Sequence, residues 1–75
     1  MKELVQYIAE NLVDDVDKVR VKDIRTSQGI VLELRVSRQD MGRVIGAEGR
    51  VANAMRAVLH VPAMRQGKQV SLEIN

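Results

Sequence analysis

Two glycines three positions apart, Gly46 and Gly49, mark the stretch whose residue types point most directly to chemistry. They belong to the run Val-Ile-Gly-Ala-Glu-Gly-Arg at positions 44–50, which leads into residues with helical periodicity. Because glycine has no Cβ, the backbone can turn tightly there and bring its amides close to a ligand. The free N–H groups at the start of the following helix point toward the same approach. The turn therefore suits a phosphodiester backbone, although a plain turn between two helices can also contain two glycines.

The side chains that could support catalysis or bind a metal ion lack the partner residues that such a site requires. His60 is the only histidine, and no nucleophile or orienting group accompanies it, so we expect it to interact with a helix end. Asp14, Asp15 and Asp17 lack the glycine and terminal glutamate of a calcium loop and are expected at a solvated helix terminus. The chain has no cysteine for a disulfide or a thiolate metal site. The sequence therefore predicts no enzyme activity, no cofactor and no small-molecule substrate.

Aromatic residues are almost absent, since Tyr7 is the only one. RRM and OB-fold domains bind single strands by stacking bases on several aromatic side chains, so the composition excludes these modules. Met41, Met55 and Met64 are expected to fill the core or an interface.

The glycine turn is expected to join two helices. Ser37 and Asp40 are spaced to cap a short helix before the turn, through Met41, Arg43 and Val44. The helix after the turn carries an apolar stripe that we expect to pack inward, at Val51, Ala54, Met55, Val58 and Leu59. Its polar side is expected at Arg50, Asn53 and Arg56.

The remaining chain supplies one more helix and three strands. Apolar residues from Leu4 to Val13 recur at helical spacing and predict a first helix. Alternating residues predict strands at 19–22 and 30–36, joined by a turn at 26–29. Pro62 is expected to break the later helix, and residues 70–74 alternate as a last strand. The predicted order is α-β-β-α-α-β, in a single domain spanning residues 1–75.

Composition and charge agree with a small domain that binds a polyanion. The 75 residues are 45% hydrophobic, enough for one modest core, so dimerisation would add useful burial. The net charge of +2 says little about binding partners, but the charge is unevenly distributed. Residues 1–34 carry five basic and seven acidic side chains, whereas residues 35–75 carry seven basic and three acidic ones. The basic half contains the glycine turn, although a solvated basic face that binds nothing would look the same. We expect a cytoplasmic protein, because the sequence has no signal peptide and no membrane span.

Residues 44–59 resemble the signature of the K-homology (KH) RNA-binding domain, Val-Ile-Gly-x-x-Gly followed by aliphatic residues at helical spacing. The additional helix and strand before this motif are similar to the bacterial type II arrangement. Over essentially the whole chain the sequence resembles the small bacterial KhpA (YlqC) family. The resemblance lies in the leading helix, the Asp-Asp-x-Asp link, the segment Asp-Met-Gly-Arg-Val-Ile-Gly and the terminal strand Gly-Lys-x-Val-Ser-Leu-Glu-Ile. The resemblance implies an α+β fold, a type II KH domain with helices packed on one face of a three-stranded sheet.

The resemblance also implies a site. In KH domains the turn that matches Gly46, Ala47, Glu48 and Gly49 contacts the backbone of about four nucleotides, and the bases lie between the helices and the sheet edge. On these grounds Val44, Ile45 and Val51 are expected to line the groove, with Arg43, Arg50 and Arg56 on its phosphate side. The family often has a lysine or arginine inside the turn, whereas Glu48 places a negative charge there.

Two functions remain open. The first is non-catalytic binding of single-stranded RNA, as a post-transcriptional regulator or RNA chaperone. The second is a protein-interaction module that keeps the KH fold but uses the glycine-turn face for dimerisation, with little RNA affinity of its own. The resemblance implies a homodimer, or a heterodimer with a KhpB (Jag/EloR)-like RNA-binding protein, and a link to cell elongation, division, cell shape and cell wall organisation.

Overall fold

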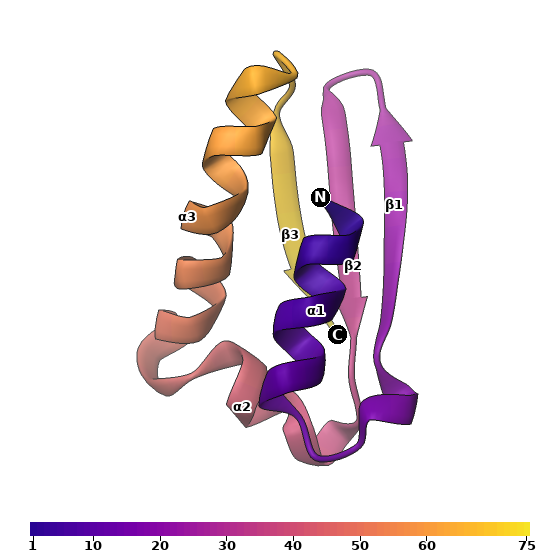
Figure 1. The fold of residues 1–75 in the computed structure, drawn as a ribbon, viewed down its shortest axis with the longest axis vertical. Helices are drawn as coiled ribbons and strands as arrows, with labels where there is room; N and C mark the ends of the chain where they lie inside the picture. The colour runs from indigo at the N-terminus through magenta and orange to yellow at the C-terminus, as the bar shows by residue number, and fades with distance from the viewer.

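The computed structural model describes residues 1–75 and places the helices on one face of a three-stranded sheet (Figure 1). The longer elements are α1 (Lys2–Leu12), β1 (Arg20–Thr26), β2 (Gly29–Arg35), α2 (Met41–Ile45), α3 (Arg50–Arg65) and β3 (Val70–Ile74). Three short 3₁₀ turns connect them, η1 (Val16–Lys18), η2 (Arg38–Asp40) and η3 (Ala47–Gly49). The predicted α-β-β-α-α-β order and the α+β class are confirmed.

The sheet has the order β1-β2-β3. β1 and β2 form an antiparallel hairpin in which Thr26 pairs with Gly29, as the turn residues predict. β3 pairs with β2 in parallel, because α2 and α3 carry the chain back along the helical face before β3 begins. β3 is therefore an edge strand, and α3 runs beside it (Figure 1).

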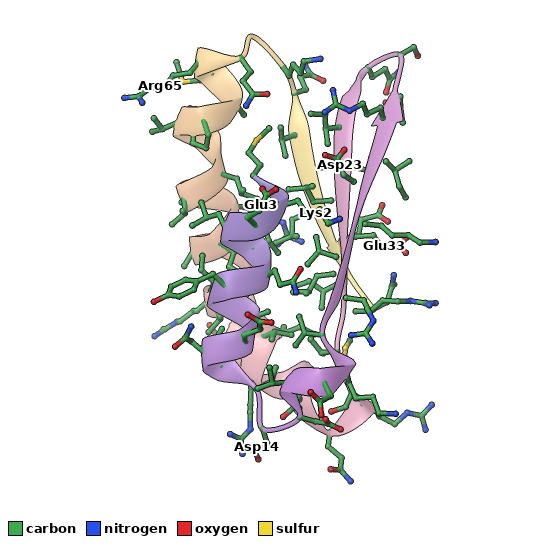
Figure 2. All side chains as sticks on the ribbon, turned by 45° about the vertical axis from the view of Figure 1, so that its right-hand side comes forward. Lys2, Glu3, Asp14, Asp23, Glu33 and Arg65 are labelled. Carbon is green, nitrogen blue, oxygen red and sulfur yellow. The ribbon has the colours of Figure 1, made fainter.

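Alternation in the strands and helical periodicity in α1 and α3 build one core between the two layers. Figure 2, turned by 45°, shows the helices on one side and the sheet on the other. The core residues are Val5, Ala9, Val13, Val19, Val21, Ile30, Leu32, Leu34, Val44, Met55, Leu59 and Leu72. No helix of the structure is long and apolar enough to cross a membrane.

The predicted break at Pro62 is wrong, since α3 continues to Arg65. Proline removes one intrahelical hydrogen bond, but Leu59 and Ala63 on either side of it are buried, and this packing keeps the helix intact. The helix ends at Arg65, and Gly67 two residues later has a left-handed φ of 64°. The amide of Lys68 bonds to the carbonyl of Ala63 and that of Gly67 to Met64, both at 3.0 Å, which is a Schellman motif.

The predicted inner stripe of α3 is partly wrong. Met55 and Leu59 are buried as expected and Val51 is half-buried, but Ala54 is exposed and Val58 is 47% exposed. The buried positions are instead Ala52, Met55, Leu59 and Ala63. Small alanines allow α3 to lie close to the sheet, and a pattern that ranks residues by hydrophobicity alone passes over them.

Candidate nucleic-acid interface

The turn between α2 and α3 has a backbone that depends on glycine. Gly46 has φ 77° and ψ 173°, a region that only glycine occupies without strain. Gly49 has φ 78° and ψ 15°, which is left-handed. Glu48 between them is also left-handed, at φ 56°, and is the only non-glycine residue in the chain with positive φ. The turn therefore carries local strain at its tip.

Space as well as torsion constrains the first glycine. A Cβ on Gly46 would lie 2.5 Å from Cγ2 and 2.8 Å from the amide nitrogen of Val51, closer than real contacts allow. A Cβ on Gly49 would meet only the side-chain nitrogen of Asn53, at 3.9 Å. Gly46 therefore lets the turn fold back onto the first turn of α3, whereas Gly49 is required only for its left-handed torsion.

The turn presents an open surface. Ala47 and Glu48 are exposed, and no side chain caps the amino terminus of α3, which begins directly after Gly49. The first N–H groups of a helix have no intrahelical partners and carry the positive end of the helix dipole. The amides of Gly49 and Arg50 already bond within the turn, to the carbonyls of Gly46 and Ala47. The attraction for an anion therefore comes mainly from the positive end of the helix dipole, and the carboxylate of Glu48 opposes it.

Asp40 anchors the short helix before the turn, in a way that differs from the predicted cap. Its carboxylate is only 2% exposed and accepts the amides of Asp14 and Asp15, both at 3.1 Å. The hydroxyl of Ser37 donates to it at 2.8 Å, but no side chain caps the backbone of α2. The two amide hydrogen bonds hold the pKa of Asp40 below its ordinary value, with smaller contributions from Ser37 and the charge of Arg43. Asp40 thereby ties the end of α1 to the start of α2.

Arg43 is engaged by the same cluster. Its guanidinium pairs with both carboxylate oxygens of Asp14, at 3.2 and 3.0 Å, and lies 3.7 Å from Asp40. Figure 2 shows Asp14 at the end of the molecule where α1 and α2 meet. Two carboxylates therefore neutralise Arg43, and Arg50 and Arg56 are the predicted phosphate-side cations without a carboxylate partner.

The predicted groove residues differ in exposure. Ile45 and Val51 are half-buried and reach the surface on either side of the turn. Val44 is fully buried and belongs to the core, so its side chain supports the turn from behind.

The outer edge of β3 lies on the side of α3 where the sequence predicts the groove. The carbonyl of Gln69 accepts from the amide of Ile30, and the amide of Asn75 donates to the carbonyl of Leu34, both at 2.8 Å. Because backbone groups alternate in direction along a strand, those of Leu72 point to the outer edge, beside α3. Arg56 confirms this direction, since its guanidinium donates to the carbonyl of Leu72 at 3.0 Å and to the side chain of Asn53 at 3.1 Å. Arg56 thus holds a cation beside the edge strand, about two helical turns beyond Gly49.

A family model described as KhpA/KhpB, KH domain matches residues 2–74. The chain belongs to this family. It is 47% identical over 74 residues to the RNA-binding protein KhpA of Clostridium perfringens, covering 99% of both chains. It is 45% identical to the RNA-binding protein KhpA of Aquifex aeolicus, covering 99% of this chain and 94% of that one. The KhpA of Chlamydia pneumoniae is also 45% identical, with 99% and 95% covered. No solved structure matches the chain significantly.

Membership of the KhpA/KhpB family confirms the predicted resemblance, and because the family is non-catalytic it also confirms that the chain is not an enzyme. Two features of this family member were missed in the sequence. The partners of Asp40 lie 25 and 26 positions away, so no local spacing reveals them. The exposed apolar side of α3 was assigned to the core, because periodicity alone does not fix which side of a broadly apolar helix packs inward.

Proposed function

We propose that this protein binds single-stranded RNA, with the sugar-phosphate backbone on the turn Gly46–Gly49 and the bases in the groove between α3 and β3. The observation that carries the proposal is the turn itself, whose torsions at Gly46 and Gly49 leave the amino terminus of α3 without a side-chain cap and accessible to an anion. The KH module clamps about four nucleotides in this way. The names of the KhpA relatives as RNA-binding proteins support the same function.

The charge distribution favours modest affinity and low sequence specificity. Arg50 and Arg56 attract phosphates, but Glu48 at the tip of the turn repels them. Tyr7 is the only aromatic side chain, so base stacking contributes little and contacts with the sugar-phosphate backbone dominate recognition. A binder of this kind suits a cytoplasmic post-transcriptional regulator or RNA chaperone, and through its transcripts it would influence cell elongation and division, cell shape and cell wall organisation.

The test is a double substitution at the exposed tip, Ala47→Asp with Glu48→Asp, measured by fluorescence anisotropy on a single-stranded oligonucleotide. The change adds one negative charge without touching the core, so the affinity should fall several-fold while the melting temperature stays close to that of the parent. Asn11→Asp on exposed α1 adds the same charge and serves as the control. Equal affinities of the tip variant and the parent would contradict RNA binding at the turn.

A second function, protein association, is favoured by the exposed apolar side of α3. Ala54, Val58 and Val61 form a stripe on this side, and Val58 and Val61 are 47% and 53% exposed. Successive residues of a helix are about 100° apart, so Val58 points about 200° away from Arg56. The stripe and the groove therefore lie on different sides of α3 and can be occupied together. We propose that the stripe packs against a second copy of the chain or a KhpB (Jag/EloR)-like KH protein.

Sedimentation at tens of micromolar separates this second function from the first. Val61→Glu should shift the protein toward the monomer, because it buries a charge in the proposed contact. Asn11→Glu on α1 carries the same added charge and should leave the dimer unchanged. A parent protein that is strictly monomeric and captures no KhpB-type partner would rule out the association.

A further inference from the structure

A hollow of about 560 Å³ lies beside the half of α3 that is farther from the glycine turn. The second half of α3, the loop 66–69 and the turn between β1 and β2 surround it. These segments meet at one end of the molecule in Figure 1, and Arg65 marks that end of α3 in Figure 2. Apart from Arg56 and Leu59, the lining residues lie outside the KH signature and the predicted site.

The walls of the hollow are held in place by backbone contacts. The amide of Ile30 donates to the carbonyl of Gln69 at 2.8 Å, which joins the β1–β2 turn to the loop before β3. Gly29 has φ 147°, and a Cβ there would overlap that same carbonyl, so only glycine permits the approach. On the α3 side, the Schellman motif at Gly67 fixes the course of the loop. The hollow is therefore formed without a ligand.

The lining chemistry matches a nucleotide. None of the 14 lining residues is acidic, while Arg56, His60 and Lys68 supply cationic or hydrogen-bonding groups. Met64, which is 67% exposed, and the half-buried Val31 and Val70 contribute apolar surface on which a base can lie. His60 is exposed and lies one helical turn after Arg56, where an imidazole can stack on a base. A small apolar floor with cations at its rim suits a base and its phosphate.

The hollow continues the path of the groove. Arg56 lines it and also contacts the edge of β3, so the groove and the hollow share this residue. Along α3, Arg56 is about 10 Å and His60 about 17 Å from Gly49, at 1.5 Å per residue. A smaller hollow adjoins it between the two turns, lined by Lys68 and by Arg25, which pairs with Asp23 at 3.8 Å. Lys68 thus adds a cation without a carboxylate partner at this end, whereas the turn carries Glu48.

We propose that this hollow binds a further nucleotide of the same RNA strand, beyond the four that the glycine turn contacts. The inference rests on the proposed RNA binding and extends it, since it assigns Lys68 and His60 to recognition. A strand long enough to reach the hollow gains contacts with cations that the turn does not provide. The site size therefore exceeds four nucleotides, and the affinity of longer strands depends on residues at the far end of α3.

The experiment compares oligouridines of four and eight nucleotides by chemical-shift titration and anisotropy, with Lys68→Glu and His60→Ala. A four-nucleotide site can bind an octamer in five registers, which raises the apparent affinity of the octamer without any new contact. Each variant is therefore compared with the parent protein on the oligonucleotide of the same length. Lys68→Glu should weaken octamer binding by about five- to tenfold, because one cation becomes an anion, and tetramer binding by less than about twofold. His60→Ala should weaken the octamer alone. Lys22→Glu on exposed β1, outside both hollows, is the control of equal charge change and should leave both lengths nearly unchanged.

Equal losses for Lys68→Glu and Lys22→Glu would mean that only net charge matters, and equal losses for tetramer and octamer would mean that Lys68 acts at the turn. Either result overturns the proposal for the hollow. The tip variant Ala47→Asp with Glu48→Asp tests the underlying function in the same assay. If the tip variant weakens both lengths and Lys68→Glu weakens neither, RNA binding at the turn stands and the hollow is excluded. If the tip variant weakens neither length, the proposed function fails instead.

Discussion

The guanidinium of Arg56 donates a 3.0 Å hydrogen bond to the backbone carbonyl of Leu72 and so joins α3 to the outer edge of β3. A second bond, to Asn53 at 3.1 Å, fixes the guanidinium from the other side. A planar group with several donors can make both bonds at once, which an ammonium group on a flexible stem does poorly. Arg56 is thus a cation of fixed position at the junction of the groove and the hollow.

Arg56→Lys should therefore bind RNA several-fold more weakly than the parent, although the charge is kept. The free energy of unfolding should fall by about 1 kcal/mol, the typical contribution of one hydrogen bond. Arg65→Lys at the exposed end of α3 is the control for the same exchange of residue types. Anisotropy and thermal melts measure both quantities, and an Arg56→Lys variant with parental affinity would show that position does not matter.

The two glycines of the turn should differ in their effect on stability. Gly46→Ala should lower the free energy of unfolding by at least about 2 kcal/mol, since it combines glycine-only torsions with a clash against Val51. Gly49→Ala should cost only about 1 kcal/mol, the penalty of the left-handed region. Gly42→Ala is the matched control, because it lies in α2 with nothing within 4 Å and should stabilise the helix. Equal melting temperatures for the first two variants would contradict the described packing of the turn.

Acid should weaken the anchor at Asp40. Hydrogen bonds from the amides of Asp14 and Asp15 lower the pKa of Asp40 in the folded state. The stabilisation is therefore present above the unfolded pKa of about 4 and is lost as the pH falls through the lower folded pKa. Asp40→Asn should lower the melting temperature at neutral pH by several degrees and make the decline toward low pH less steep. The exposed Asp17→Asn should change neither, and thermal melts over the acid range distinguish the two.

Reversing the charge at the tip of the turn should strengthen RNA binding. At about 6 Å and a water-like dielectric, Glu48 costs on the order of 0.7 kcal/mol per phosphate, and a lysine would add a similar attraction. Glu48→Lys should thus raise the affinity several-fold, up to about tenfold at low salt, and the gain should shrink as salt screens the exposed site. Glu10→Lys on α1 should do much less. Equal gains from the two would mean that only net charge matters.

Local patterns predicted the elements and the turn, because each depends on neighbouring residues. The period of α1, the alternation of β2 and the Thr26–Gly29 turn all appear where expected. The course of α3 through Pro62 was not predictable, since it depends on burial of Leu59 and Ala63 against the sheet. In such places tertiary packing outweighs local propensity.

The backbone of the glycine turn was predictable to the same degree. Gly46 and Gly49 predict a tight turn, and the positive φ of both glycines in the structure agrees with this prediction. The environment of Arg43 was not visible, because Asp14, its partner, lies 29 positions earlier. The hollow was not predictable either, because its walls come from α3, the loop 66–69 and the β1–β2 turn, which only the fold brings together.

Amide chemical shifts of the ¹⁵N-labelled protein, titrated with single-stranded RNA, test the central claim most directly. The turn and the groove should respond most strongly, with the largest changes at residues 45–51, at Arg56 and along β3. The outer face of β1, including Lys22, should change little. Shift changes that are absent, or that are confined to the exposed apolar stripe of α3, would contradict RNA binding at the glycine turn.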